Sequence, residues 1–125
     1  MSFAQDVEDS TESSASVYNI YEVHDIPMFN GEPMENELRI FISNNINYPD
    51  SAMKYETQGV VVLTFIVKPD STVSQVTVIT PPKGNGLEEE SIRVLESTSG
   101  LWTPAMISGK PVAVRLQIPI NFKLF

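Results

Sequence analysis

The sequence contains no cysteine and only one histidine, His24, among its 125 residues. The absence of cysteine excludes a disulfide framework, thiolate metal sites and a cysteine nucleophile. A single imidazole with no second imidazole or thiolate cannot complete a transition-metal site, so we expect His24 to be an ordinary surface residue. No apolar run approaches the roughly 18 to 20 residues of a membrane span. The longest run, residues 60–67, is interrupted by Thr64.

Positive charge is scarce and unevenly placed. Eight Lys and Arg stand against sixteen Asp and Glu, and the first cation is Arg39. Nine carboxylates precede Arg39, so residues 1–38 carry −9, whereas the remaining eight cations and seven carboxylates sum to +1. Scattered cations cannot form the phosphate-neutralising stripe that nucleic-acid binding requires, and they equally disfavour an anionic membrane surface. We therefore predict that the chain binds neither nucleic acid nor a membrane surface.

No group of residues has the arrangement of a catalytic site. The glutamates at positions 88–90 are consecutive in a predicted helix, where side chains point about 100° apart and do not converge. They complement the positive end of that helix instead. The glycine-containing turn at 84–86 lacks the complete pattern of a phosphate-binding loop. The serines have only His24 as a base. The sequence therefore predicts a protein that is not an enzyme and holds no cofactor and no metal.

The start of the chain is acidic and poor in apolar residues. Between positions 5 and 16 only Val7 and Ala15 are apolar, which is too little buried surface to offset the entropy lost on ordering. We predict a disordered acidic tail over residues 1–17 and one folded domain over residues 18–125. Residues 2–5 resemble the end of a secretory signal, with small residues at the −3 and −1 positions of a cleavage site, and so hint at export.

Two helices, a hairpin and a long last strand account for most of the predicted domain. A proline in the first turn and apolar residues at helical spacing predict a helix over residues 33–45. The other predicted elements are an extended arm over 18–23 followed by a turn, a helical turn at 50–53 capped by Asp50 or Ser51, a strand over 59–67, a strand over 73–80, a helix from 87, a loop from 102 to 111 and a strand over 112–124.

The last strand alternates apolar and polar residues, which is typical of a half-buried strand. Val114, Leu116 and Ile118 lie on the apolar parity. Pro119 lies within the strand and removes a hydrogen-bond donor from the ladder, a change that edge strands tolerate. We therefore predict that the last strand is an edge of the sheet.

The strand over 59–67 is apolar at both parities, which predicts a central strand. Val60, Val62 and Ile66 would leave an apolar stripe on the sheet face opposite the helices, and we expect residues 18–29 or a second subunit to cover it.

These elements predict an α+β fold, a two-layer sandwich in which an antiparallel β-sheet of three or more strands carries two α-helices on one face. We expect the largest aromatic residues of the strands and loops to be buried in its core. They are Phe65, Trp102 and Phe122.

Five short motifs stand in the order and spacing of a known family. They are Tyr48-Pro49 with Ala52, the strand 59–67 with a turn at Asp70, Arg93 in the second helix, Trp102-Thr103-Pro104-Ala105 with Gly109-Lys110-Pro111-Val112, and Ile118-Pro119-Ile120-Asn121-Phe122. With them, residues 18–125 resemble the periplasmic C-terminal domain of the TonB energy-transducer family. Ser71, Ser91 and Asn30 stand where the family usually has Gly, Ala and Gly, and these conservative departures leave the predicted fold intact.

The resemblance implies a peptide-binding domain in the periplasm of the Gram-negative cell envelope. Proteins of this family grip the TonB box, a short peptide of outer-membrane transporters, by strand addition to the last strand, and so couple inner-membrane energy to nutrient import. The unpaired backbone groups of an edge strand suit such addition. By the resemblance, the peptide-binding residues are Tyr48 and Pro49 beside the peptide, with Arg115, Gln117, Pro119 and Asn121 on the receiving strand.

A full transducer also requires an amino-terminal membrane anchor and a Pro-rich spacer, which this sequence does not contain. We expect one of two alternatives. Either an upstream anchor, which would be the chain's link to the membrane, was removed, or the chain is a free-standing relative. The alternative function is therefore a soluble, unanchored periplasmic adaptor with the same fold. Such an adaptor would form a homodimer through the edge strand or through the second face of the central strand.

Overall fold

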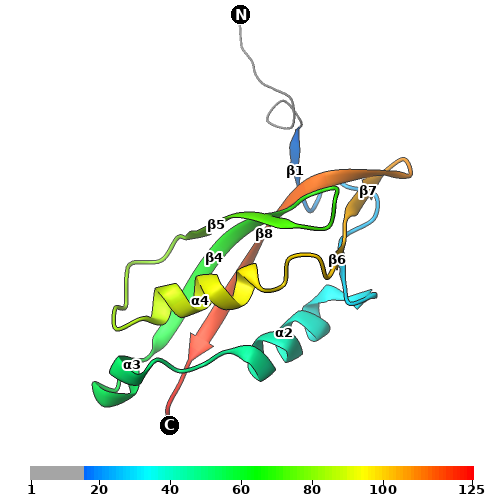
Figure 1. Cartoon of the computed structure of the whole chain (residues 1–125). Coiled ribbons are helices and arrows are strands. Elements are labelled where there is room, and N and C mark those ends of the chain that lie inside the picture. The colour runs from blue at the N-terminus through cyan, green and yellow to red at the C-terminus, as the bar shows by residue number, and fades with distance from the viewer. Residues whose placement is uncertain (1–15) are drawn as a thin grey trace, which may run out of the picture.

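A sheet covered on one face by helices makes up most of residues 16–125, the part of the chain that this computed structural model describes. In chain order the elements are β1 (Val17–Asn19), β2 (Met28–Phe29), β3 (Glu32–Pro33), α2 (Met34–Asn45), α3 (Asp50–Lys54), β4 (Gly59–Val67), β5 (Val73–Val78), α4 (Leu87–Glu96), β6 (Trp102–Thr103), β7 (Ala105–Ile107) and β8 (Lys110–Phe122). Figure 1 shows α2 and α4 on the same face of the sheet. The predicted α+β fold with two helices on one face is confirmed.

Strand β4 is the centre of the main sheet, as its apolar sequence predicted. It pairs antiparallel with β8 from Gly59↔Phe122 to Val67↔Val114, and with β5 on its other side. The sheet order is β1-β8-β4-β5, with β7 also paired to β8. A second, smaller sheet joins β3, β2 and β6. None of the helices in residues 16–125 has the length and apolarity that a membrane span requires.

The position of β8 in the sheet differs in part from the prediction. On the side away from β4, β1 pairs with it in parallel at Ala113 and continues to Arg115. The prediction that the last strand is an edge is therefore right for Leu116–Phe122 and wrong for residues 113–115. β1 begins at Val17, the last residue of the predicted tail, and residues 1–15 of that tail lie outside the described residues.

The core lies between the sheet and the helices. Phe65, Trp102 and Phe122 are 1%, 3% and 3% exposed, so the prediction that they are buried is confirmed. The ring of Trp102 packs edge-on against Phe29 at 5.0 Å between centroids, and its Nε1 donates to Thr98 Oγ1 at 3.0 Å. This pairing gives the buried indole its polar partner.

The amino-terminal arm takes a different route from the one predicted. Phe29 is fully buried in the core on the helical side, where it also packs against Phe41 of α2. The expectation that residues 18–29 cover the opposite face of the sheet is not met at Val60, which remains 41% exposed, although Ile66 on the same face is buried. Cover by a second subunit stays a prediction. The short strands β2 and β6 stand where the sequence predicted a turn and a loop, because two-residue strands carry no periodicity to detect.

Two of the three helices in residues 16–125 begin at a proline. Pro33 and Pro49 occupy the N-cap positions of α2 and α3, and neither helix has a side-chain cap hydrogen bond. The prediction that Asp50 or Ser51 caps α3 is wrong, because both residues lie within that helix.

The glutamates at the start of α4 bind specific backbone groups rather than only complementing the helix end. Glu88 accepts the N–H groups of Lys83 at 2.6 Å and Gly84 at 3.1 Å. Burial acts to raise the pKa of Glu88, but backbone hydrogen bonds, chiefly those from Lys83 and Gly84, and the charge of Lys83 lower that pKa overall. The two bonds therefore fix the loop before α4.

Glu90 ties α4 to the end of α2. It accepts the N–H of Asn47 at 2.6 Å and pairs with Arg93 at 2.6 Å, while Arg93 donates to the carbonyl of Asn45 at 2.9 Å. The hydrogen bond from Arg93 is the main cause that lowers the pKa of Glu90, and burial opposes it.

We expect these lowered pKa values to make the fold weaken in acid. A carboxyl group whose pKa is lower in the folded state stabilises the fold above its unfolded value, here 4.5, and this contribution disappears as pH falls through the folded pKa. Since Arg93 is 49% exposed, the Glu90 contribution should stay below about 1 kcal/mol. Thermal unfolding of wild type and Glu90→Gln, followed from neutral pH to about pH 3, should converge in acid. The exposed neighbour provides the control Glu89→Gln, and equal pH slopes for Glu90→Gln and wild type would contradict the assignment.

Candidate functional site

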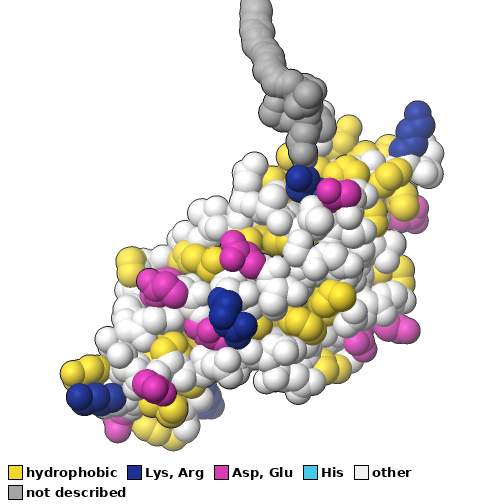
Figure 2. All heavy atoms as spheres, in the orientation of Figure 1, with side chains coloured by type: hydrophobic (Ala, Val, Ile, Leu, Met, Phe, Trp, Pro, Cys, Tyr) yellow, Lys and Arg dark blue, Asp and Glu magenta, His cyan; other side chains and the backbone are white. Residues whose placement is uncertain are grey.

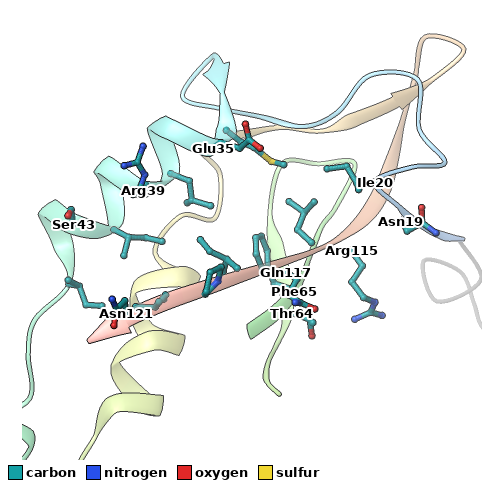
Figure 3. Close-up of a pocket in the computed structure, with 18 of the residues that line it drawn as sticks. Asn19, Ile20, Glu35, Arg39, Ser43, Thr64, Phe65, Arg115, Gln117 and Asn121 are labelled. Atoms are coloured by element: carbon teal, nitrogen blue, oxygen red, sulfur yellow. The ribbon is translucent and has the colours of Figure 1, made fainter. Parts of the chain in front are cut away.

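A groove of about 850 Å³ runs between α2 and the carboxyl-terminal part of β8. Figure 3 shows Glu35, Arg39 and Ser43 on α2, with Gln117 and Asn121 on β8 across the groove. Its lining residues come from the arm (Asn19, Ile20, Tyr21), from α2 and the residue after it (Met34, Glu35, Leu38, Arg39, Ile42, Ser43, Ile46), from β4 (Thr64, Phe65) and from β8 (Arg115, Leu116, Gln117, Ile118, Pro119, Ile120, Asn121).

The walls of the groove are apolar because each element turns its apolar residues toward the core. Leu38 and Ile42 are four residues apart, so they share one face of α2, and both are buried. On β8 the even-numbered residues face the helices, and among them Leu116 and Ile120 are buried. The groove therefore offers an apolar surface beside a strand edge.

The backbone of β8 presents hydrogen-bonding groups to this edge. Val62 accepts the N–H of Ile79 at 2.9 Å and donates to Thr80 Oγ1 at 3.1 Å, so both its backbone groups face β5. In an antiparallel ladder, opposite residues either exchange both hydrogen bonds or point both pairs of groups away from each other. Pro119 lies opposite Val62, and its carbonyl therefore points to the free side. By the same alternation, Gln117 and Asn121 direct their N–H and C=O groups to the free side.

The two edges of the sheet are not equivalent. The pairing of β5 with β4 is interrupted by a register shift between Thr64 and Ile66, and Gln75 of β5 has φ +51°. Such a bulge twists an edge and discourages further strand pairing. The register of β8 with β4 is continuous over nine residue pairs. In the described part of the chain, β8 thus presents the straighter edge.

A tight turn closes one end of the groove. Asn19 Oδ1 accepts the N–H of Tyr21 at 2.9 Å, and Glu22 Oε1 accepts the N–H of Asn19 at 2.8 Å. The chain therefore leaves β8 directly after Asn19, and Ile20 packs against the core beside the groove.

Two cations stand at the rim. Arg39 donates to Asn36 Oδ1 at 2.6 Å, and neither Arg39 nor Arg115 forms an ion pair with a carboxylate of the described residues. The side chain of Arg115 points away from α2 (Figure 3). Charged residues on the helical face are scattered rather than gathered into a field of one sign (Figure 2). Residues 16–125 contain no group of three or more His, Asp and Glu that could hold a metal ion.

Comparison with known proteins agrees with this architecture. The family model described as the Gram-negative bacterial TonB protein C-terminal matches residues 44–124. The chain belongs to this TonB C-terminal family. The family is one of non-catalytic interaction domains. The matched range covers α3, α4 and the three long strands, but only the last two residues of α2.

Two solved structures of a TonB C-terminal domain share the fold. The NMR solution structure of Helicobacter pylori TonB residues 179–285 has a TM-score of 0.59 and 24% sequence identity, over 72% of this chain and 79% of that chain. The NMR structure of residues 194–285 of the same protein has a TM-score of 0.55 and 22% identity, over 70% of this chain and 90% of that chain. A search of curated proteins found no significant match.

The structure brings together four of the six predicted peptide-binding residues. Arg115, Gln117, Pro119 and Asn121 line the groove along β8. All four side chains are exposed, and they project from the face of the sheet opposite the helices.

The other two predicted residues, Tyr48 and Pro49, do not line the groove. The ring of Tyr48 packs edge-on against Phe122, the last residue of β8, at 5.6 Å between centroids, and its hydroxyl donates to the carbonyl of Thr57. Pro49 packs near Gly86, where an added Cβ would lie 3.1 Å from the proline ring. Both residues therefore stand at the far end of the receiving strand, and their part in binding remains a prediction.

The α2 wall is the part of the site that the sequence analysis did not identify. The sequence predicts α2 from apolar residues at helical spacing, and Arg39 enters only as the first cation of the chain. The spacing of the apolar residues shows that α2 has an apolar face, but it does not show which strand edge that helix lies beside.

Proposed function

We propose that this TonB C-terminal domain binds the TonB box of an outer-membrane transporter in the periplasm and so couples inner-membrane energy to nutrient import. The observation that carries the proposal is the continuous edge of β8 over Leu116–Phe122, which no strand of residues 16–125 pairs with and which lies beside an apolar groove. A bound peptide would become the next strand of the sheet, a recognised mode of peptide capture.

Main-chain hydrogen bonds would supply most of the affinity. Gln117 and Asn121 each offer an N–H and a C=O, and Pro119 offers only its C=O, so the edge presents five groups. Each bond formed contributes about 0.5 to 1.5 kcal/mol net. We therefore expect peptides of differing sequence to bind the same edge, which suits a domain that serves transporters.

Side chains of the peptide would select its sequence and register. Alternate residues of an added strand point to opposite faces of the sheet. Those on the helical side would lie in the groove against Leu116, Ile118 and the α2 wall, so apolar residues are favoured there. Those on the other side would lie near Arg115 and Gln117, where an acidic residue would meet a cation that no described carboxylate neutralises.

The proposal is tested by titration with a fluorescent peptide from the amino-terminal segment of a transporter of the same organism. We expect saturable binding of that peptide and none of a scrambled version. Tyr48→Ala should weaken binding about five-fold because it removes the ring that supports the end of β8, whereas the matched variant Tyr48→Phe keeps the ring and should bind as wild type. Absence of binding to wild type would overturn the proposal.

The alternative of a homodimeric adaptor uses the same free edge, and the 41% exposure of Val60 on the uncovered face is compatible with it. Sedimentation of the unliganded protein separates the two functions. A stable dimer that binds no transporter peptide would favour the adaptor, and a monomer that binds the peptide would favour the transducer domain.

A further inference from the structure

Strand β1 lies on the same edge that the proposed function assigns to the peptide. It pairs in parallel with β8 as Val17↔Ala113, Tyr18↔Val114 and Asn19↔Arg115. Among the described strands β8 is its only partner. Few of its side-chain atoms are buried: Val17 is 43% exposed, Asn19 is exposed and Tyr18 is half-buried.

β1 uses backbone groups of the same kind as those left free farther along the strand. Ala113 and Arg115 share the odd parity of Gln117 and Asn121, so their N–H and C=O groups also point away from β4. In a parallel pair the C=O of Ala113 and the N–H of Arg115 meet the N–H and the C=O of Tyr18, which is opposite Val114. The whole side of β8 away from β4 is therefore one edge, Ala113–Phe122, of which β1 occupies three residues and leaves the seven residues Leu116–Phe122 open.

The end of β1 coincides with the start of the groove. The turn held by Asn19 and Glu22 diverts the chain before it can pair with Leu116, and Ile20 and Tyr21 line the groove at that end. A peptide on the open part of the edge would therefore meet β1 and could extend only by replacing it.

We propose that β1 is an intramolecular occupant of the peptide-binding edge, which limits a bound peptide to about seven residues until a longer partner strand displaces it. This inference rests on the proposed function, because it concerns the same edge. Strand-for-strand exchange is feasible because the incoming residues replace the hydrogen bonds of β1 with equivalent ones, and displacement exposes little apolar surface.

A reversible tether tests the inference within one protein. Val17→Cys with Ala113→Cys places two thiols on directly paired residues of neighbouring strands, whose usual separation of about 4.8 Å lies within the Cα range of a disulfide. The chain has no other cysteine, so no competing disulfide can form. Oxidation locks β1 on the edge, and reduction releases it.

The probes are fluorescent peptides from the same transporter segment, one of seven residues and two of ten residues, extended by three residues at one end or the other. We expect the seven-residue peptide to bind the oxidised and reduced forms equally. One of the two ten-residue peptides should bind the reduced form about ten-fold more tightly than the oxidised form, because only one extension runs over Ala113–Arg115.

Two proline variants repeat the test without a disulfide. Tyr18→Pro removes an N–H that faces β8, whereas Val17→Pro removes one that faces away from it. Tyr18→Pro should therefore bind the sensitive ten-residue peptide more tightly than wild type, and Val17→Pro should not. If the oxidised and reduced forms bind both ten-residue peptides equally while the seven-residue peptide binds, the inference is wrong and the proposed function stands. If no peptide binds any form, both are wrong.

Discussion

Replacing Gln117 with proline is expected to weaken peptide capture strongly while the fold persists. The N–H of Gln117 points to the free side of β8, so the substitution removes no hydrogen bond to β4, and proline is tolerated at such edge positions. It does remove one of the two N–H donors on the open edge, those of Gln117 and Asn121, and places a ring where the peptide backbone must approach. Loss of about two main-chain hydrogen bonds corresponds to ~2 kcal/mol, or roughly a 30-fold weaker affinity.

Gln117→Ala is the matched control, because it shortens the same side chain and keeps the backbone donor. It should bind the transporter peptide within about three-fold of wild type, since an exposed side chain at this position contributes little. Circular dichroism and the thermal midpoint of both variants establish that the fold is retained. Equal binding by wild type and a folded Gln117→Pro would show that the peptide docks elsewhere.

Phe65→Ala and Trp102→Ala are expected to lower the free energy of unfolding by about 3 to 5 kcal/mol each. The two rings lie 5.7 Å apart between centroids and are 1% and 3% exposed, so each truncation leaves a cavity at the centre of the core. Trp102→Ala also leaves the hydroxyl of Thr98, which is fully buried, without its indole donor. Such a loss is a large fraction of the 5 to 15 kcal/mol that stabilises a typical domain.

Val60→Ala provides the comparison on the same strand, because Val60 is 41% exposed on the uncovered face. Urea unfolding should show a loss of less than about 1 kcal/mol for this variant. If Phe65→Ala were as stable as Val60→Ala, the face of β4 that packs against the helices would have been assigned incorrectly.

The regular elements were predictable because their residues repeat with the period of the structure. β8 alternates with period two, and α2 combines a proline at its start with apolar residues at helical spacing. The Tyr48-Pro49 and Trp102-Thr103-Pro104-Ala105 motifs led to the family that the comparison established. Ser71, noted as a departure from the family's usual glycine, adopts φ +78°, the left-handed conformation that favours glycine.

The pairing of β1 with β8 was not predictable from local pattern. It joins residues nearly a hundred positions apart, and a three-residue strand that is mostly exposed leaves no alternation to detect. Similarly, the sequence predicted the binding residues on β8 but none on α2. The polar residues Arg115, Gln117 and Asn121 mark the exposed parity of a strand, whereas the opposing α2 wall depends on how the helix packs over the sheet.

The measurement that tests the central claim most directly is residue-resolved amide hydrogen exchange on the free protein and on its complex with the transporter peptide. In the free protein, the N–H groups of Gln117 and Asn121 should exchange rapidly, while those of Ile118 and Ile120, which face β4, should be protected. Addition of the peptide should slow exchange at Gln117 and Asn121 and leave the edge of β5 unchanged. Peptide binding that protects β5 or the helices while Gln117 and Asn121 continue to exchange rapidly would contradict strand addition at β8.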